Sequence, residues 1–182
     1  MIKNKFEENR IKRRSDVLIH ATALFLENDI EKVKMTDIAL SSETGVASIY
    51  RYFGTKQKLV VEVGTNLWTS VNKEYSKIYN NSEYNLSSGL NQCKALLGIF
   101  NTLAKEKALF LKFNADFDRY VAKEGISTEN LAEYEEAVID SQSKFLNAIK
   151  KGREDLSVRE DFDEKIYYLA FTHSLFALSG KI

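Results

Sequence analysis

Residues 33–59 read VKMTDIALSSETGVASIYRYFGTKQKL, and this stretch decides how the chain is expected to fold. Apolar residues recur with a helical period in two short segments, 36–42 and 46–52, with a turn of small and polar residues between them. Thr36 offers an N-cap oxygen to the first segment, and Gly45 can cap the second. Two helices this short and joined this tightly have the proportions of a helix-turn-helix.

The second short helix is the segment expected to read DNA, because in a helix-turn-helix that helix enters the major groove. Ile49 and Phe53 would hold it to the scaffold. Its small side chains could approach a thymine methyl, its hydroxyls could bond phosphates or base edges, and Arg51 could pair with phosphate or guanine. Lys56, at the start of the next helix, would meet the phosphate backbone. The outward-facing set is Val46, Ala47, Ser48, Tyr50, Arg51 and Tyr52.

The rest of the chain also reads as helices, because its apolar residues keep a 3.6-residue period and no convincing strand alternation occurs. Proline is absent and only 8 glycines occur, so few residues interrupt helices. We therefore predict an all-α fold. The eight expected helices span about 8–28, 36–42, 46–52, 56–80, 86–100, 109–121, 128–152 and 161–180.

Composition excludes several function classes. The chain has 182 residues, 44% of them hydrophobic, which is enough for an ordinary core. Its apolar runs fall far short of the roughly 20 residues that a membrane span needs, and its polar N-terminus lacks the apolar segment of a signal peptide, so we expect a soluble, cytoplasmic protein with no membrane partner. Cys93 is alone and the histidines are only His20 and His173, so no disulfide, metal or cofactor is expected. No catalytic triad, phosphate-binding loop or HExxH pair suggests an enzyme.

Charge is distributed unevenly along the chain. The formal net charge is zero, but the first sixty residues carry 11 Lys and Arg against 8 Asp and Glu. The remaining residues carry 15 against 18. This excess at one end is compatible with a polyanionic partner, although surface charge varies this much in many proteins.

Residues 33–39 and 45–59 resemble the DNA-binding signature of the tetracycline-repressor (TetR/AcrR) family. The similarity runs without a gap from about Arg14 to Leu67, and its most specific part is the run Tyr-Arg-Tyr-Phe-x-x-Lys at 50–56. The resemblance implies DNA-binding roles for eight residues. It implies that Thr36 caps the second helix near a phosphate, that Tyr50 and Lys56 clamp phosphates, and that Val46, Ala47, Ser48, Arg51 and Tyr52 face the groove.

Two positions depart from the family pattern, which usually has glycine at both. Asn28-Asp29 follows the first helix, and Glu43 lies in the turn of the helix-turn-helix. Asn and Asp tolerate a left-handed backbone, so the first departure is mild. Glu43 predicts a turn that is slightly strained or differently shaped.

The resemblance also implies a division into two domains. Residues 1–57 would form the helix-turn-helix DNA-binding domain, and 58–182 a helical ligand-sensing and dimerisation domain whose last two long helices build a four-helix bundle between subunits. The helices predicted at 128–152 and 161–180 are long enough for this, and their apolar faces include Phe145, Phe171 and Phe176. One recognition helix buries too little surface for tight operator binding, so a dimer that reads two half-sites is expected.

Aromatic residues of the second domain suggest a central ligand cavity lined by the predicted fourth to seventh helices. Aromatic rings supply rigid walls for an apolar or aromatic ligand, although core packing is the simpler explanation for any one of them. The candidates are Trp68, Phe100, Phe110, Phe113, Phe117 and Tyr120.

These observations predict a sequence-specific DNA-binding transcriptional regulator. The expected form is a homodimeric repressor that a small molecule, bound in the C-terminal domain, releases from a palindromic operator; linkage requires that the operator weaken ligand binding by the same factor. An activator, or a regulator controlled by a protein partner, would have the same N-terminal sequence. A helical adaptor that had lost DNA binding would be expected to lose Tyr50 and Lys56, and both are present.

Overall fold

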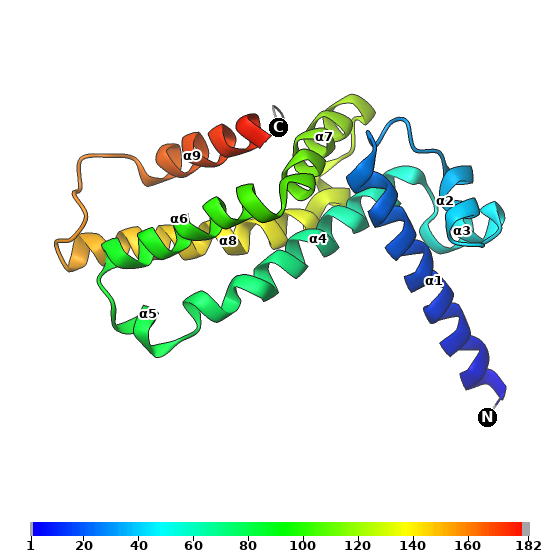
Figure 1. Cartoon of the computed structure of the whole chain (residues 1–182), viewed down its shortest axis with the longest axis horizontal. Coiled ribbons are helices and arrows are strands. Elements are labelled where there is room, and N and C mark those ends of the chain that lie inside the picture. The colour runs from blue at the N-terminus through cyan, green and yellow to red at the C-terminus, as the bar shows by residue number, and fades with distance from the viewer. Residues whose placement is uncertain (1, 180–182) are drawn as a thin grey trace.

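The computed structural model describes residues 2–179, and within them the chain forms helices and turns with no strand (Figure 1). The all-α prediction is confirmed. The helices of this described range are α1 (Ile2–Glu27), α2 (Met35–Ser41), α3 (Val46–Phe53), α4 (Lys56–Tyr79), α5 (Ser82–Leu86), α6 (Gly89–Glu106), α7 (Ala108–Glu124), α8 (Thr128–Glu154) and α9 (Glu164–Ser179).

The sequence did not predict α5, a single turn after the polar break at the end of α4. Asn81 is its N-cap, and the Asn81 side chain accepts a hydrogen bond of 2.7 Å from the backbone N–H of Tyr84. Asparagine is one of the preferred N-cap residues because its side-chain oxygen satisfies an amide that the helix leaves unpaired. The residues expected only to end α4 therefore also begin α5.

Several other helix ends differ from the prediction, and α6 covers Gly89–Glu106 instead of about 86–100. α1 begins at Ile2, about two turns before the expected start. α9 begins at Glu164 instead of 161, because Asp163 Oδ1 accepts 2.9 Å hydrogen bonds from the backbone N–H groups of Lys165 and Ile166. The predicted end of this last helix, residue 180, lies outside the described residues.

The buried side chains form two clusters, and α4, α7 and α8 contribute to both. The first, which we call the N-terminal cluster, joins α1, α2, α3 and the first half of α4 to α7 and to Leu131 of α8, and Phe113 and Phe117 enter it from α7. The other joins the second half of α4, from Trp68 onward, to α6, α7, α8 and α9. Figure 1 shows α2 and α3 at one end of the elongated molecule and α5 at the other. Because both clusters share these three helices, the N-terminal helices are packed firmly on the rest of the chain.

α6 and α8 approach each other closely at two glycines. A Cβ added at Gly89 would collide with the backbone of Gly152. Gly98, on the same helix as Gly89, has nothing within 4 Å of an added Cβ. Only at Gly89, therefore, does the packing of α6 on α8 require the absence of a side chain.

A single carboxylate organises the loop at the end of α8. Asp155 Oδ2 accepts a 2.7 Å hydrogen bond from the backbone N–H of Gly89, and its Oδ1 accepts one of 3.0 Å from the backbone N–H of Ser157. The hydrogen bonds from Ser157 and then from Gly89 hold the pKa of this carboxyl below its ordinary value of 3.8.

Three features limit what else the fold could do. No helix in the described part of the chain is both long and apolar enough to cross a membrane. Among the side chains that the structure describes, no three His, Cys, Asp or Glu residues are grouped as metal ligands. Cys93 is a buried thiol, and burial raises its pKa, so it is poorly suited to react as a thiolate.

Candidate nucleic-acid interface

α3 is held by one apolar face and presents the opposite face to solvent. Ile49 is fully buried and Phe53 is 5% exposed, as predicted. His20 of α1 also supports the motif, because its Nδ1 lies 2.8 Å from the hydroxyl of Ser41 at the end of α2. The helix-turn-helix is thus a rigid part of the N-terminal core, and its orientation is fixed by α1.

The solvent face of α3 contains the predicted DNA-reading residues, exposed to different degrees. Ala47, Tyr50 and Arg51 are exposed, and Tyr50 retains 48% of its surface. Ser48 is half-buried, and its hydroxyl accepts a 3.3 Å hydrogen bond from Arg51 Nη2. Val46 and Tyr52 are also half-buried and pack against the N-terminal cluster. Tyr50 and Arg51 are therefore the side chains most open to a double helix.

Arg51 is oriented by its neighbours on α3. Its guanidinium carbon lies 5.7 Å from the centre of the Tyr52 ring, within range of a cation–π contact. With the Ser48 bond, this contact positions a planar cation at the solvent face, where it could pair with a phosphate or the edge of a guanine.

The turn of the helix-turn-helix has a left-handed residue where the sequence departs from glycine. Glu43 has φ +50°. Backbone bonds close the turn, from Ser42 N–H to Ile38 O at 2.9 Å and from Thr44 N–H to Ala39 O at 3.0 Å. A side chain in this conformation is strained, so the predicted strain at Glu43 has a direct structural basis. At Asn28-Asp29, the other departure, the backbone has no positive φ.

Thr36 is exposed, but it is not the N-cap of α2. The helix begins at Met35, and Lys34 is its N-cap. The Asp37 side chain accepts a 2.8 Å hydrogen bond from the backbone N–H of Lys34, which stabilises a start earlier than the one predicted. The predicted capping role of Thr36 is therefore wrong, and its hydroxyl lies in the first turn at the surface.

Lys56 is half-buried at the first turn of α4. Its Nζ donates a 3.2 Å hydrogen bond to the backbone carbonyl of Glu31 and lies 5.6 Å from the centre of the Tyr120 ring of α7. Burial lowers the pKa of Lys56 from its ordinary value. Thr55 caps α4, and its side chain accepts a hydrogen bond from the backbone N–H of Lys58. The amino group therefore lies between the N-terminal end of α4 and α7.

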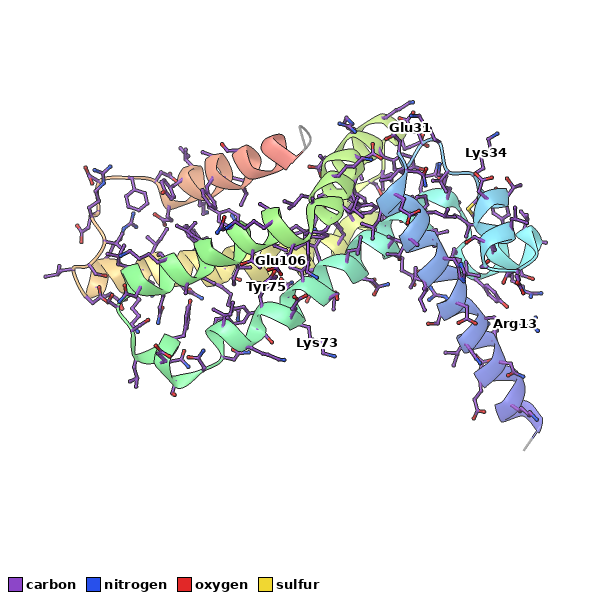
Figure 2. All side chains as sticks on the ribbon, in the orientation of Figure 1. Arg13, Glu31, Lys34, Lys73, Tyr75 and Glu106 are labelled. Carbon is purple, nitrogen blue, oxygen red and sulfur yellow. The ribbon has the colours of Figure 1, made fainter. Side chains whose placement is uncertain are left out.

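Further polar contacts between α7 and the N-terminal helices escaped the sequence reasoning. Asp116 Oδ2 accepts a 2.6 Å hydrogen bond from the backbone N–H of Ile30, and Lys123 forms a 2.7 Å ion pair with Glu31, which Figure 2 labels in the loop after α1. The partners are 86 and 92 residues apart, and no local pattern marks them. These contacts join the loop between α1 and α2 to α7.

Comparison with known proteins decides between a helix-turn-helix and a pair of unrelated short helices. Residues 18–63 match the family model of bacterial regulatory proteins of the tetR family. The chain carries a TetR-family DNA-binding domain. It is thus a DNA-binding transcription factor and not an enzyme, and the predicted resemblance is confirmed. A search of curated proteins found no sequence match to this regulator.

Solved structures of other regulators share the fold. The fatty acid degradation regulator FadR from Bacillus halodurans has a TM-score of 0.66 at 14% identity, over 93% of this chain and 83% of that chain. A TetR-family transcriptional regulator from Vibrio parahaemolyticus has a TM-score of 0.59 at 19% identity, over 93% and 85%. The TetR regulatory protein from Mycobacterium vanbaalenii has a TM-score of 0.58 at 19% identity, over 97% and 98%. At such identities, the comparison shows a common fold.

The predicted ligand residues lie in two separate regions of the structure. Phe113, Phe117 and Tyr120 pack in the N-terminal cluster. Trp68 and Phe110 lie in the other cluster, with ring centres 5.1 Å apart and an edge-to-face geometry. The side chain of Phe100 lies outside the described residues. The six predicted residues thus do not surround one common cavity among the side chains that the structure describes.

A small cavity of about 30 Å³ lies where α4, α6 and α8 meet. It is lined by Trp68, Val71, Asn72, Tyr75, Tyr79, Leu96, Ile99, Leu103, Lys144 and Phe145. Trp68 Nε1 donates a 2.9 Å hydrogen bond to Asn114 Oδ1, whereas the buried hydroxyl of Tyr75 has no hydrogen-bond partner among the described residues. The volume accommodates one or two waters.

A larger groove of about 350 Å³ lies on the other side of Phe145, which lines both spaces. Apolar side chains of α6, α8 and the loop before α9 form its floor, and Lys94 and Arg159 supply positive charge. A volume of this order falls within the range of small-molecule sites. Besides Phe145, the groove is lined by Leu90, Cys93, Lys94, Leu97, Ile149, Val158, Arg159, Phe162 and Tyr167.

Proposed function

We propose that this TetR-family regulator is a homodimeric repressor that binds a palindromic operator through α3 and is released from it by a small molecule. The observation that carries the proposal is the solvent face of α3, which is polar and open at Tyr50 and Arg51 while Ile49 and Phe53 hold the helix in place. Such a regulator acts on the chromosome, and we place it in the cytoplasm.

The proposed contacts follow the exposed side chains. Tyr50, Lys56 and Thr36 bind phosphates, and their loss would weaken binding to all sequences. The half-buried position of Lys56 means that its amino group must exchange the Glu31 carbonyl for a phosphate when DNA binds. The groove-facing set is Val46, Ala47, Ser48, Arg51 and Tyr52, among which Arg51 is best placed to select a base.

Exposed apolar side chains on α9 support the proposed dimer. Ile166 is 67% exposed and Leu169 is 47% exposed on a helix that packs its other face against the same chain. Phe145 is buried within its own subunit, so it is not part of the proposed seam, and the side chain of Phe176 lies outside the described residues. We place the seam on α8 and α9, within 128–152 and 161–180, because apolar surface of this kind is stabilised by a second copy in a twofold contact.

We retain the proposed division into a DNA-binding domain at 1–57 and a ligand-sensing and dimerisation domain at 58–182. α4 crosses this boundary and α7 contacts both sides of it. A ligand that shifts α7 would move the loop held by Asp116 and Lys123 and change the spacing of the two recognition helices in the dimer.

We assign the effector to the larger groove, because its volume suits a small molecule and the 30 Å³ cavity does not. Its apolar floor and its cations, Lys94 and Arg159, favour a mainly apolar ligand with an acidic or polar end. Leu97→Trp would fill the groove. That variant should still bind operator, but an effector that releases the wild-type protein should no longer release it.

Selection of bound fragments from a random duplex library, at roughly 150 mM salt, tests the operator proposal. An inverted repeat should be enriched, because each subunit of a twofold dimer reads one half-site. Arg51→Ala should change the selected bases, whereas Lys73→Ala, which removes an exposed cation of α4 far from α3, should leave them unchanged. Folded protein that enriches no sequence, or an Arg51→Ala profile identical to that of the wild type, would contradict the proposal.

A further inference from the structure

The basic excess of the first sixty residues lies entirely in residues 1–16. Residues 1–16 contain six Lys and Arg and three Asp and Glu, whereas 17–60 contain five of each. The helix-turn-helix and its supports are therefore electrically neutral as a set. Long-range attraction to DNA depends on positive charge, so within the first sixty residues it has to come from the segment before the motif.

That segment is the N-terminal half of α1, which projects from the body of the molecule (Figure 1). Val17 is the first buried residue of α1 among those whose side chains the structure describes, and Ile11 is 61% exposed. The family match begins at residue 18, so the projecting helix precedes it. Residues 2–14 span about 20 Å at the helical rise of about 1.5 Å per residue. We call residues 2–14 the arm.

The arm has cations that make no ion pair within the described part of the chain. Arg10 pairs with Glu7 at 2.6 Å, and Arg14 pairs with Glu62 at 2.6 Å. The remaining cations whose side chains the structure describes, Lys5, Lys12 and Arg13, are exposed and take part in none of the ion pairs.

Arg13 lies on the same side of α1 as the helix-turn-helix. His20, seven residues later and so two helical turns along the same stripe, contacts Ser41 at the end of α2. Figure 2 shows Arg13 pointing from α1 toward the side of the molecule on which α2 and α3 lie. A duplex against α3 would therefore bring its flanking phosphates toward this side of the arm.

We propose that the arm binds the phosphate backbone of the DNA that flanks each half-site, through Lys5, Lys12 and Arg13, and supplies most of the sequence-independent attraction. This inference rests on the proposed function. A preformed helix loses less conformational entropy on binding than a disordered basic tail would. The partner is a nucleic acid and not a membrane, because the three large apolar residues of the arm, Ile2, Phe6 and Ile11, are too few to give it the continuous apolar face that an interfacial helix needs.

The test compares two triple variants that remove the same charge. The arm variant is Lys5→Ala, Lys12→Ala and Arg13→Ala. The control variant is Lys73→Ala, Lys77→Ala and Lys105→Ala, three exposed lysines of α4 and α6 far from the helix-turn-helix. Alanine favours helix, so both variants should keep the helicity and oligomeric mass of the wild type, which circular dichroism and light scattering would check.

Affinity for an arbitrary duplex of about 40 base pairs is measured by fluorescence anisotropy as a function of salt. Each phosphate contact contributes a slope of about 0.9 in log affinity against log salt, so three lost contacts lower the slope by about 2.7 per bound subunit. Between about 50 and 200 mM salt the wild-type affinity should fall about 40-fold more per subunit than that of the arm variant. The control variant should keep the wild-type slope.

Three results would overturn the inference or its basis. If the arm variant keeps the wild-type slope, the arm makes no phosphate contact. If the slope falls by the same amount in both variants, the attraction depends only on net charge and the arm makes no specific contribution to it. If wild-type protein binds no duplex at low salt, the proposed function itself fails, and this outcome is distinguishable from the other two.

Discussion

Glu43→Gly should stabilise the regulator, because residue 43 has φ +50° and a Cβ in that region is strained. The left-handed conformation costs an L-residue roughly 1–2 kcal/mol, and glycine returns about 0.5–1 kcal/mol of this through its greater freedom in the unfolded chain. The net gain in the free energy of unfolding should therefore be about 0.5–1 kcal/mol. For a chain of this size that raises Tm by about 1–4 °C. Thermal denaturation followed by circular dichroism at constant subunit concentration would measure it.

Two further variants separate the backbone effect from other causes. Glu43→Gln removes the charge and keeps the strain, so its Tm should stay close to that of the wild type. Glu160→Gly makes the same replacement at an exposed loop residue without a positive φ, and should not stabilise. If Glu43→Gly lowers Tm as much as Glu160→Gly does, the turn is not strained at residue 43 and the reasoning is refuted.

Three other changes test the packing, the dimer and the pH response. Gly89→Ala should destabilise by more than about 2 kcal/mol, because its Cβ would meet the backbone of α8, whereas Gly98→Ala should gain about 0.5–1 kcal/mol as a glycine replaced inside an open helix; urea unfolding compares the two. Leu169→Arg should convert dimers to monomers in sedimentation experiments, and Leu86→Arg, at another exposed leucine, should leave the mass unchanged. Asp155 has a folded pKa below 3.8, so its contribution to stability is complete above that pH and is lost as pH falls through the lower, folded value. Asp155→Asn should thus flatten the acid limb of the stability profile, and an unaltered limb would argue against those hydrogen bonds.

The fold class and the positions of the long helices could be predicted because they depend on local patterns. The period of the apolar residues set the buried face of α3, and burial of Ile49 and Phe53 follows from it. Helix ends were less predictable, because several polar residues compete for each cap. At α2, the Asp37 side chain accepts a hydrogen bond from the backbone N–H of Lys34, and the helix begins at Met35. Threonine is a preferred N-cap residue, so the sequence favoured a start at Thr36 instead.

The DNA-facing residues were predictable for the same local reason, whereas their present partners were not. Tyr50 and Arg51 follow from their places on a short helix with one buried face. The half-buried state of Lys56 depends on Tyr120 and on the carbonyl of Glu31, which folding brings to it from distant parts of the chain. The hydrophobic period and the composition of the sequence do not predict such long-range contacts.

The predicted ligand residues were also misplaced because their surroundings depend on long-range packing. A run of aromatic residues on one helix suggests a shared surface, but a helix as long as α7 can contribute to two cores. Phe110 packs beside Trp68, whereas Phe117 stacks on Tyr134 with ring centres 4.3 Å apart in the N-terminal cluster. Which core each ring enters depends on how α4 and α8 cross α7, and crossing is a property of the packed helices. The groove on Phe145 is formed in part by the irregular loop before α9, so its residues share no period that a sequence could display. A ligand site assembled in this way can be identified only from the folded structure, whereas the DNA-binding helix can be predicted from the sequence.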